Sequence, residues 1–401
     1  GARITLIQWN SFVPAADAEV KRQAAEFSSK FDCEVVISTI TQDDLIQKTP
    51  AFVQANNGPD IIQMQYGWPH LYTTACLDVT NETNIVRQKL GKIHPVNDAF
   101  TKVQGVYRAI PYTIVVNAWT YRTDYFQKAG VSSFPKTFEE MLPAAQKLKS
   151  VTGKPLSQTV GHAYGDSLTM WNPVLWAFGA KETDDKGKVS INSKETLAAI
   201  DWANRAKAAG MAFHPEWLDP DNNQAYHSDQ ISGTLNGASI YIRERDRDKH
   251  FDKVTDNAVM PQGPKGLFTI NLIFNHAVMK WSPEPDTAKA FVLYLMDKDN
   301  YMKWMAQAGG YDIGCFDAIN NPPIFSSDPK LKAFHDVAYD DKGAPVGKWP
   351  GWPAAPSKKT SQAQAQYIVA DMFAKALAGT DAKAAVTEAD ERLHNIWDKP
   401  A

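Results

Sequence analysis

Two short loops combine aromatic rings with amide groups, and this pairing suits a ligand that is partly apolar and partly polar. Trp9-Asn10-Ser11 follows the first predicted strand, and Gln65-Tyr66-Gly67-Trp68 follows the third. A sugar presents an apolar C–H face and a rim of hydroxyl groups, so an aromatic plane beneath it and hydrogen-bonding groups around it would hold it. The predicted ligand-binding residues of these loops are Trp9, Asn10, Ser11, Gln65, Tyr66 and Trp68. In the alternative interpretation, the Trp rings only close the end of the sheet.

A second group of candidate residues lies near the middle of the chain. Trp171-Asn172-Pro173 has the composition of a helix N-terminus. Proline is tolerated in the first turn because the N–H groups there have no partner within the helix. The loop before it contains Tyr164 and Asp166 among polar residues, where ligand contact and ordinary solvation are equally good interpretations. We predict ligand binding by Tyr164, Asp166, Trp171 and Asn172.

The segment Ser239–Arg247 contains closely spaced arginines that could select an anionic ligand. If it is a strand, its alternation places Tyr241, Arg243 and Arg245 on one face. A guanidinium group on that face could hold a carboxylate, sulfonate or phosphate through paired N–H donors. Alternatively, the neighbouring carboxylates neutralise the arginines. We include Arg243 and Arg245 among the predicted ligand-binding residues.

The elements that must position these residues alternate between strand and helix. The predicted strands are Arg3–Ile7, Cys33–Ser38 and Ile61–Met64, which are rich in apolar and β-branched residues. Between them, Val20–Phe31 carries apolar residues at helical spacing, and a second helical stretch begins at Asp43. Strands alternating with helices indicate βαβ units, so the predicted fold class is α/β.

Local signals predict where several helices begin and end. Thr137 and Glu140 have the spacing of a capping box, so a helix should start at Thr137. Pro50 should break or kink the helix that begins at Asp43. Gly379 should separate two C-terminal helices, with Asp381 available to cap the second.

The composition is that of a folded chain with two domains. The 401 residues are 44% hydrophobic and 22% charged, and the 12 Trp and 14 Tyr residues exceed what core filling needs. A net charge of −3 gives no general attraction to nucleic acid or anionic lipid. No stretch approaches the roughly 18 apolar residues that a membrane span requires. We therefore expect no nucleic-acid partner and no membrane span.

Motifs of catalysis and metal binding are missing from the sequence. Nucleophile elbow, zincin and Walker patterns do not occur, and no pair of carboxylates is singled out for glycoside hydrolysis. Cys33, Cys76 and Cys315 lie too far apart for zinc or redox motifs. A Cys33–Cys76 disulfide and three free, buried thiols both stay open. We predict no catalytic residues, no metal and no cofactor.

A series of motifs resembles, in order, the extracellular solute-binding proteins of carbohydrate ABC importers, the maltose-binding-protein-like family. Each motif is common alone, but their order extends along nearly the whole chain. They are Gly58-Pro59-Asp60-Ile61-Ile62, Gly105-Val106-Tyr107, Ile110-Pro111-Tyr112, Tyr121–Gly130, Pro135–Glu140, Asp185–Lys188, Leu235–Ala238, Met260–Pro264 and Ser282–Phe291.

The resemblance implies a type II-like periplasmic-binding-protein fold. Each of its two lobes would be a mostly parallel sheet flanked by helices, with the ligand in a cleft between the lobes. The N-terminal lobe would hold residues 1–112 and 273–315, and the C-terminal lobe residues 113–272 and 316–401. Three crossings would fall near Tyr112–Thr113, Leu272–Asn275 and Cys315–Phe316.

The resemblance also implies the function of a non-catalytic receptor. It would bind an oligosaccharide or a neutral or anionic sugar derivative and deliver it by hinge closure to an ABC importer permease. The protein would be a monomer in the periplasm or outside the cell, with its signal peptide removed. Four further predicted contacts come from the crossings and the Trp-Pro-rich segment: Tyr112, Asn271, Tyr311 and Trp352.

Two departures from the family pattern bear on the ligand. The family often has a polar or acidic residue a few positions after the Ile-Pro pair, where this chain has Val115. Together with the arginines of Ser239–Arg247, this substitution favours a ligand other than a plain maltodextrin. The alternatives are the same fold binding a polyamine or an organic anion and, less favoured, a carbohydrate-active enzyme.

Overall fold

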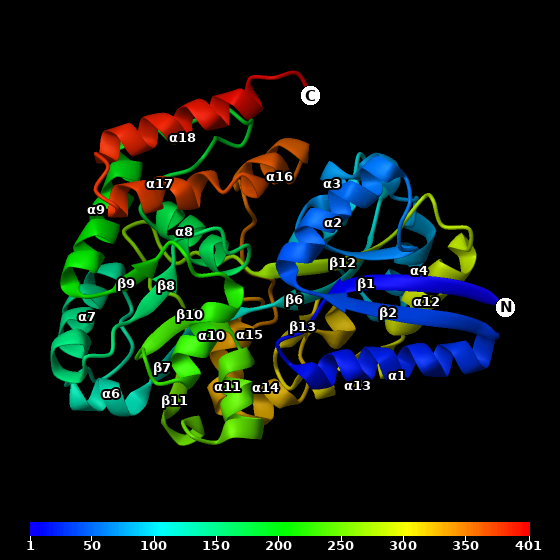
Figure 1. Cartoon of the computed structure of the whole chain (residues 1–401), viewed down its shortest axis with the longest axis horizontal. Helices are drawn as coiled ribbons and strands as arrows, with labels where there is room; N and C mark the ends of the chain where they lie inside the picture. Colours follow the sequence, from blue (N-terminus) through cyan, green and yellow to red (C-terminus); the bar gives the residue numbers. More distant parts are fainter. The chain divides into compact units, whose positions relative to one another are not determined.

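A computed structural model describes the whole chain, Gly1–Ala401, and divides it into two compact units (Figure 1). Unit 1 comprises Gly1–Val115 and Leu272–Pro329, and unit 2 comprises Val116–Asn271 and Lys330–Ala401. The chain therefore passes from one unit to the other three times. The third passage lies beyond the predicted Cys315–Phe316, because Phe316 is fully buried and forms a bridge with Ile93 of unit 1.

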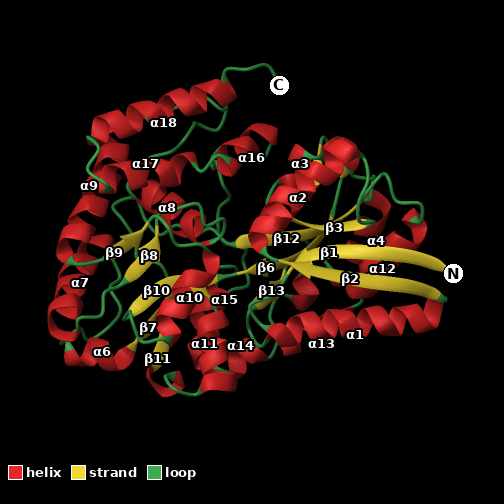
Figure 2. Ribbon diagram, viewed as in Figure 1, coloured by secondary structure: helices red, strands yellow, loops and turns green.

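Unit 1 is built on one six-stranded sheet in the order β13-β6-β12-β3-β1-β2, with helices on both of its faces (Figure 2). The strands are β1 (Ala2–Trp9), β2 (Cys33–Ile40), β3 (Ile61–Gln65), β6 (Ile110–Val115), β12 (Leu272–Val278) and β13 (Asp312–Gly314). This confirms the first three predicted strands. A separate hairpin pairs β4 (Lys102–Val103) with β5 (Val106–Tyr107).

The sheet of unit 1 is mixed, so the prediction of a mostly parallel sheet is wrong. β1 pairs in parallel with β2 and β3, whereas β12 is antiparallel to β3 and β6, and β13 is antiparallel to β6. β6 ends at Val115, where the chain leaves unit 1, and β12 begins at Leu272, where it returns. These two residues pair with each other, so the strands run in opposite directions.

The helices of unit 1 follow the alternation that the sequence predicts. They are α1 (Pro14–Phe31), α2 (Gln42–Ala55), α3 (Trp68–Leu71), α4 (Thr80–Leu90), α5 (Pro95–Thr101), α12 (Pro285–Leu295), α13 (Lys298–Ala308) and α14 (Ile324–Ser327). The predicted break at Pro50 does not occur, and α2 continues to Ala55. Although Pro50 has no N–H for a helical hydrogen bond, the buried Leu45 and Thr49 anchor this helix in unit 1.

All three cysteines are free thiols. Cys33 lies on the edge strand β2, whereas Cys76 forms a bridge with Met279 just beyond β12. The strands β1 and β3 lie between β2 and β12 in the sheet. Of the two alternatives left open by the sequence, the Cys33–Cys76 disulfide is therefore wrong.

Unit 2 contains two smaller sheets. β7 (Asn117–Arg122) pairs antiparallel with β10 (Gly233–Gly237) and β11 (Thr255–Ala258), and β8 (Ser157–Thr159) pairs in parallel with β9 (Ala212–His214). The prediction of a mostly parallel sheet is wrong here too, because β7 lies between two antiparallel neighbours. The helices are α6 (Thr123–Lys128), α7 (Phe138–Thr152), α8 (Asp166–Ala177), α9 (Lys194–Ala209), α10 (Asp219–His227), α11 (Ser239–Arg243), α15 (Lys332–Asp336), α16 (Lys358–Ala365), α17 (Ile368–Leu377) and α18 (Ala382–Trp397).

Side-chain caps define two helix starts as the sequence predicts. Thr137 accepts a hydrogen bond from the Glu140 N–H at 3.1 Å, and α7 begins at the next residue. Asp381 accepts one from the Ala384 N–H at 3.3 Å and caps α18. Both predictions are confirmed, because a cap depends only on residues close in sequence.

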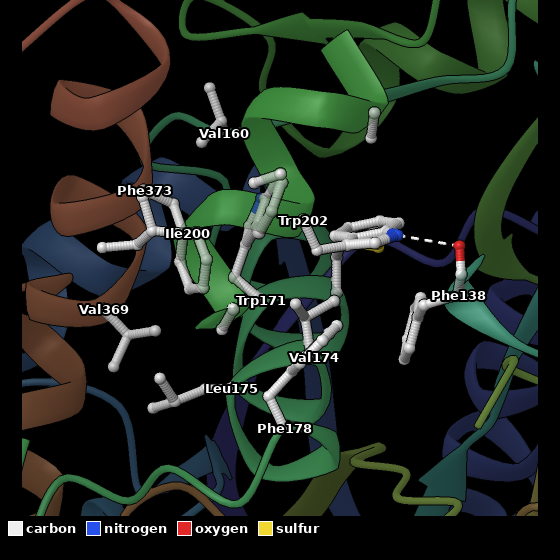
Figure 3. Packing of buried hydrophobic residues seen from close by; sticks show 14 of the residues in the cluster. Phe138, Val160, Trp171, Val174, Leu175, Phe178, Ile200, Trp202, Val369 and Phe373 are labelled. Atoms are coloured by element: carbon white, nitrogen blue, oxygen red, sulfur yellow. Dashed lines mark hydrogen bonds between the residues drawn. The ribbon is translucent and has the colours of Figure 1, made fainter. Parts of the chain in front are cut away.

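The core of unit 2 is organised around buried tryptophans (Figure 3). Trp202 donates its indole N–H to the Phe138 carbonyl at 2.8 Å, and Trp171 donates to the Thr159 carbonyl at 2.8 Å. Both rings are 0% exposed, and Trp171 packs 4.7 Å from the Phe373 ring. Trp171 is therefore a core residue, and its prediction as a ligand contact is wrong.

We predict that Trp171→Ala lowers the free energy of unfolding by about 3–5 kcal/mol, because it leaves a cavity and an unpaired carbonyl. Trp171→Phe should lose less, because a ring still fills most of the space. Denaturant unfolding followed by circular dichroism measures both changes. An Ala variant as stable as the wild type would contradict the core assignment.

Candidate functional site

One pocket of unit 1 lies where several strands end. It is lined by the carboxyl-terminal residues of β1 and β6, the first residues of β12 and β13, and the first turns of α1. Its empty volume is about 430 Å³, including the part open to solvent. Ligands of open α/β sheets bind at such strand ends. This pocket is the candidate site.

Aromatic side chains form the apolar part of the pocket. Trp9 is half-buried, with its ring 6.0 Å from that of Phe274. Tyr112 lies 4.7 Å from Trp304 at an interplanar angle of 32°. Tyr311 also lines the pocket. These rings provide the apolar surface on which a sugar C–H face can lie.

Asp17 provides the first carboxyl group of the pocket. It lies in the first turn of α1, where its oxygens accept hydrogen bonds from the Ser11 N–H at 2.8 Å and the Gln8 side-chain amide at 3.0 Å. Burial raises the pKa of Asp17, while these two hydrogen bonds and the charge of Lys21 oppose that rise. The hydrogen bonds fix the carboxylate beside the loop that carries Trp9.

Asp312 provides the second carboxyl group. It is the first residue of β13, is 5% exposed, and pairs with Val115. Its Oδ1 lies 3.4 Å from the Thr113 hydroxyl, and the protein offers no hydrogen bond to Oδ2. Burial is the main cause that raises the pKa of Asp312 to about 8; the Thr113 hydrogen bond opposes it and the charge of Asp17 adds to it. At neutral pH this group is mostly protonated, so it can both donate and accept a hydrogen bond.

Five of the predicted residues line this pocket together: Trp9, Asn10, Ser11, Tyr112 and Tyr311. The sequence analysis missed several of their neighbours, namely Gln8, Asp17, Gln63, Thr113, Phe274, Trp304 and Asp312. The position of Asp17 soon after Trp9-Asn10-Ser11 was a signal that could have identified it. Asp312 directly follows the predicted Tyr311, but its burial beside Thr113 depends on the pairing of β13 with a strand almost 200 residues earlier in the chain.

The loop after β3 turns into the interior of unit 1. Gln65 and Gln42 exchange two hydrogen bonds of 2.6 Å, and Gln65 is fully buried. Tyr66 adopts a φ of 48° and is also fully buried, with its ring 6.1 Å from Phe100. Trp68 begins α3 and is 5% exposed. None of the three predicted residues Gln65, Tyr66 and Trp68 lines the pocket, because this turn directs them inward.

The predicted ligand-binding residues Trp171 and Asn172 lie within α8 and not at its start. Trp171-Asn172-Pro173 is inside the helix, which begins at Asp166, so it is not a helix N-terminus. Asn172 lines a second, smaller pocket of unit 2 with Glu182, and burial raises the pKa of Glu182 to about 7.

Tyr164 and Asp166 are buried rather than part of a solvated loop. The Asp166 N–H donates to Asp219 Oδ1 at 2.9 Å, and Asp166 Oδ2 has no hydrogen-bond partner. Burial first, and then the charges of Asp219 and Asp221, raise the pKa of Asp166 well above its usual range. Tyr164 packs against Tyr367, with 6.3 Å between ring centroids.

The segment with the arginines is helical, so its interpretation as an alternating strand is wrong. α11 runs from Ser239 to Arg243 and continues into a π-helical turn. Ile240 and Glu244, which are four residues apart, are both fully buried, as expected for one face of a helix. Arg243 pairs with Asp248 at 2.8 Å, and Arg245 pairs with Asp246 at 2.7 Å. Local carboxylates therefore engage both arginines, and neither lines a pocket of unit 1 or unit 2 described above.

Asn271 and Trp352 contact other parts of unit 2. Asn271 accepts from the Asn117 N–H at 3.3 Å and donates to the Val337 carbonyl at 2.8 Å. Trp352 packs 5.6 Å from the Trp176 ring, and the ammonium of Lys348 lies 5.0 Å from the Trp352 ring. Both contact sets hold loop segments of this unit in place.

One group of side chains in unit 2 has the residue types of a metal site. The ligand atoms of His227, Glu244 and Asp248 lie within 4.8 Å of one another. The Glu244 oxygens, however, accept from the Phe251 N–H at 2.8 Å and face His227 Nδ1 at 2.5 Å, while Asp248 pairs with Arg243. The arrangement is a hydrogen-bonded network whose carboxylates already have protein partners.

A comparison with known protein families identifies the family of this chain. The profile of a family described as bacterial extracellular solute-binding protein matches residues 22–333. The chain belongs to this family. The family consists of solute-binding proteins and is non-catalytic. Separately, none of the helices is both long and apolar enough to cross a membrane.

One curated protein resembles this chain in sequence, and several solved structures share its fold. A probable ABC transporter-binding protein of Deinococcus radiodurans is 21% identical over 287 residues, which cover 69% of this chain and 67% of that protein. The GacH receptor of Streptomyces glaucescens, with structures unliganded and in complex with acarbose, shares the fold with a TM-score of 0.84, 16% identity and 100% coverage of both chains. Maltose-bound T. maritima MalE3 matches with a TM-score of 0.79, 19% identity and coverage of 98% and 100%. The fold is therefore the α/β periplasmic-binding-protein fold.

We predict that Asp312→Asn stabilises the protein more at pH 8 than at pH 5. The pKa of Asp312 is about 8 in the folded state, above the value of about 3.9 for an unfolded chain. The unfolded state therefore releases this proton at a lower pH than the folded state, and the wild type loses stability as the pH rises from about 4 to 8. Asparagine removes that loss.

Melting temperatures of both proteins across this pH range test the prediction. Asp185→Asn removes one carboxylate at an exposed turn of unit 2 and is the control, because it removes the same charge without a buried group. A difference between Asp312→Asn and the wild type that is constant with pH would contradict the raised pKa.

Proposed function

We propose that the chain is the solute-binding component of an ABC importer and that its solute is a carbohydrate, either an oligosaccharide or a sugar derivative. The observation that carries this proposal is the unit 1 pocket, which gathers aromatic rings and hydroxyl-binding groups around one space. The proposal includes residence in the periplasm or outside the cell, a monomeric state, and delivery to a permease by hinge closure.

The chemistry of the pocket supports a sugar. The ring of Trp9 offers an apolar plane, while the Asn10 amide and the two carboxyl groups can bond to hydroxyls. Asp312 is suited to a hydroxyl group, because its protonated form donates and accepts at once. A sugar hydroxyl group also donates and accepts hydrogen bonds, so it could exchange two hydrogen bonds with the protonated Asp312 carboxyl group.

Structural relatives bind ligands of this class. The GacH receptor has been solved with acarbose, MalE3 with maltose, and a sugar transporter protein from Arthrobacter chlorophenolicus with laminaribiose. The last has a TM-score of 0.81 at 18% identity, with 100% of both chains covered. These ligands support a carbohydrate as the solute of this chain.

An organic cation such as a polyamine is the second candidate. Asp17 and Asp312 among aromatic rings form the kind of surroundings that attract a cation. The same carboxyl groups disfavour an organic anion, the other alternative considered from the sequence.

Thermal-shift measurements against monosaccharides, oligosaccharides, polyamines and organic anions test the proposal. At least one sugar should raise the melting temperature, because a ligand that binds only the folded state must stabilise it. Stabilisation by polyamines alone, with no response to any sugar, would contradict the carbohydrate assignment.

We predict that Trp9→Ala weakens binding of the stabilising sugar roughly tenfold or more, which is about 1.4 kcal/mol, because it removes the apolar plane. Trp281→Ala is the matched control: this half-buried Trp of unit 1 donates to the Pro59 carbonyl at 2.9 Å and does not line the pocket. Isothermal titration calorimetry measures both affinities. Equal losses in the two variants would assign the effect to general destabilisation.

A further inference from the structure

The unit 1 pocket contains acidic side chains without any basic counterpart. Asp17 and Asp312 both line it, and its lining includes no Lys, Arg or His side chain. Elsewhere in the protein, carboxylates are commonly paired with cations, as in Arg122–Asp124 and Arg205–Glu139. The pocket has no basic side chain in its lining, and the charge of Lys21 on α1 acts on Asp17 from outside that lining.

The two carboxyl groups are prepared for different roles. Asp17 is held by the Ser11 N–H and the Gln8 amide, and these bonds favour its ionised form. Asp312 keeps Oδ2 without a protein partner, although the residue is 5% exposed and lines the pocket. Oδ2 is not enclosed by the protein, so a ligand in the pocket can reach it and complete its bonding.

The aromatic rings around these carboxyl groups favour the same kind of ligand. Trp9, Tyr112, Phe274, Trp304 and Tyr311 line the pocket, and an ammonium group near a ring face is attracted by the ring's electrons. Charge and rings thus both favour a cation, whereas a hydroxyl group uses only the hydrogen-bonding capacity.

We propose that this pocket takes the protonated amine of an amino sugar, with the ammonium group bound by Asp312 and Asp17 and the sugar face on the aromatic rings. The inference rests on the proposed carbohydrate function and adds the charge of the solute. It replaces the expectation of an anionic sugar derivative, because the arginines on which that expectation depended pair with Asp248 and Asp246.

Binding of an ammonium group should release a proton from the protein. A positive charge beside Asp312 lowers its pKa, which is about 8 in the unliganded protein. The other titratable groups near it are Asp17, Tyr112, Tyr301 and Tyr311, and Lys21 on α1 acts on Asp17. Burial holds the pKa of Tyr112 well above its usual value of about 10, so this tyrosine does not titrate between pH 6 and 8. The amine of a sugar is less basic than an alkylamine, because neighbouring oxygens withdraw electrons, so its titration in the free ligand is measured separately and subtracted.

Calorimetric titrations with matched ligands test the inference. The probes are glucose, three analogues in which an amine replaces the hydroxyl at carbon 2, 3 or 6, and N-acetylglucosamine as the uncharged counterpart of the first. At least one amine should bind about tenfold more tightly than glucose. Titration in two buffers of different ionisation enthalpy should show proton release at pH 7 after correction for the titration of the free amine, and the affinity for the ammonium form should rise from pH 6 to pH 8.

Asp312→Asn should reduce the preference for the amine over glucose about tenfold or more, because it removes the ionisable partner and keeps the shape. Asp185→Asn should leave the preference unchanged. Proton release in the wild type is a second readout that requires no variant.

The outcomes separate this inference from the proposed function. If glucose binds as tightly as every amine, with no proton release, the charge assignment is wrong and the sugar function stands. If no sugar or amino sugar binds while spermidine does, the carbohydrate function itself is wrong, and the amino-sugar inference fails with it.

Discussion

The pairing of β6 with its two neighbours is the constraint on which the candidate site depends. Val115, the last residue of β6, pairs with Leu272 on one side and with Asp312 on the other. Pro111 lies opposite Asn275 and has no N–H for the ladder, and the register of β12 shifts between Phe274 and Asn275. These pairings bring Thr113, Phe274 and Asp312 to the same edge of the sheet, so segments far apart in sequence form one pocket.

Burial of a carboxyl group is the energetic consequence of this arrangement. A carboxylate at Asp312 would be poorly solvated, so the group keeps its proton at neutral pH. Burial also raises the pKa of its neighbour Asp17, but hydrogen bonds from Ser11 and Gln8 oppose that rise. A carboxyl group whose pKa is raised by burial within a pocket is a candidate ligand-binding group. The protein retains a costly group where a ligand can compensate for it.

Strands and helix caps that depend on neighbouring residues could be predicted from the sequence. Contacts that depend on the pairing of strands far apart in the chain could not. The strands β1 to β3, the caps Thr137 and Asp381, and the family motifs all depend on local patterns. The burial of Asp312 could not be predicted, because its strand was not recognised and its partner is Val115. Trp171 shows the converse error: aromatic and polar residues side by side resembled a binding loop, yet the ring fills a core. In α11 the charges alternate as in a strand, but burial of Ile240 and Glu244 follows helical spacing.

A crystal structure of the protein with the solute that co-purifies with it tests the central claim most directly. The account predicts that a sugar ring lies against Trp9 and that a polar atom of the solute is within hydrogen-bond distance of Asp312 Oδ2, at about 2.5–3.2 Å. A bound solute that contacts neither Trp9 nor Asp312, with the unit 1 pocket holding only water, would contradict it.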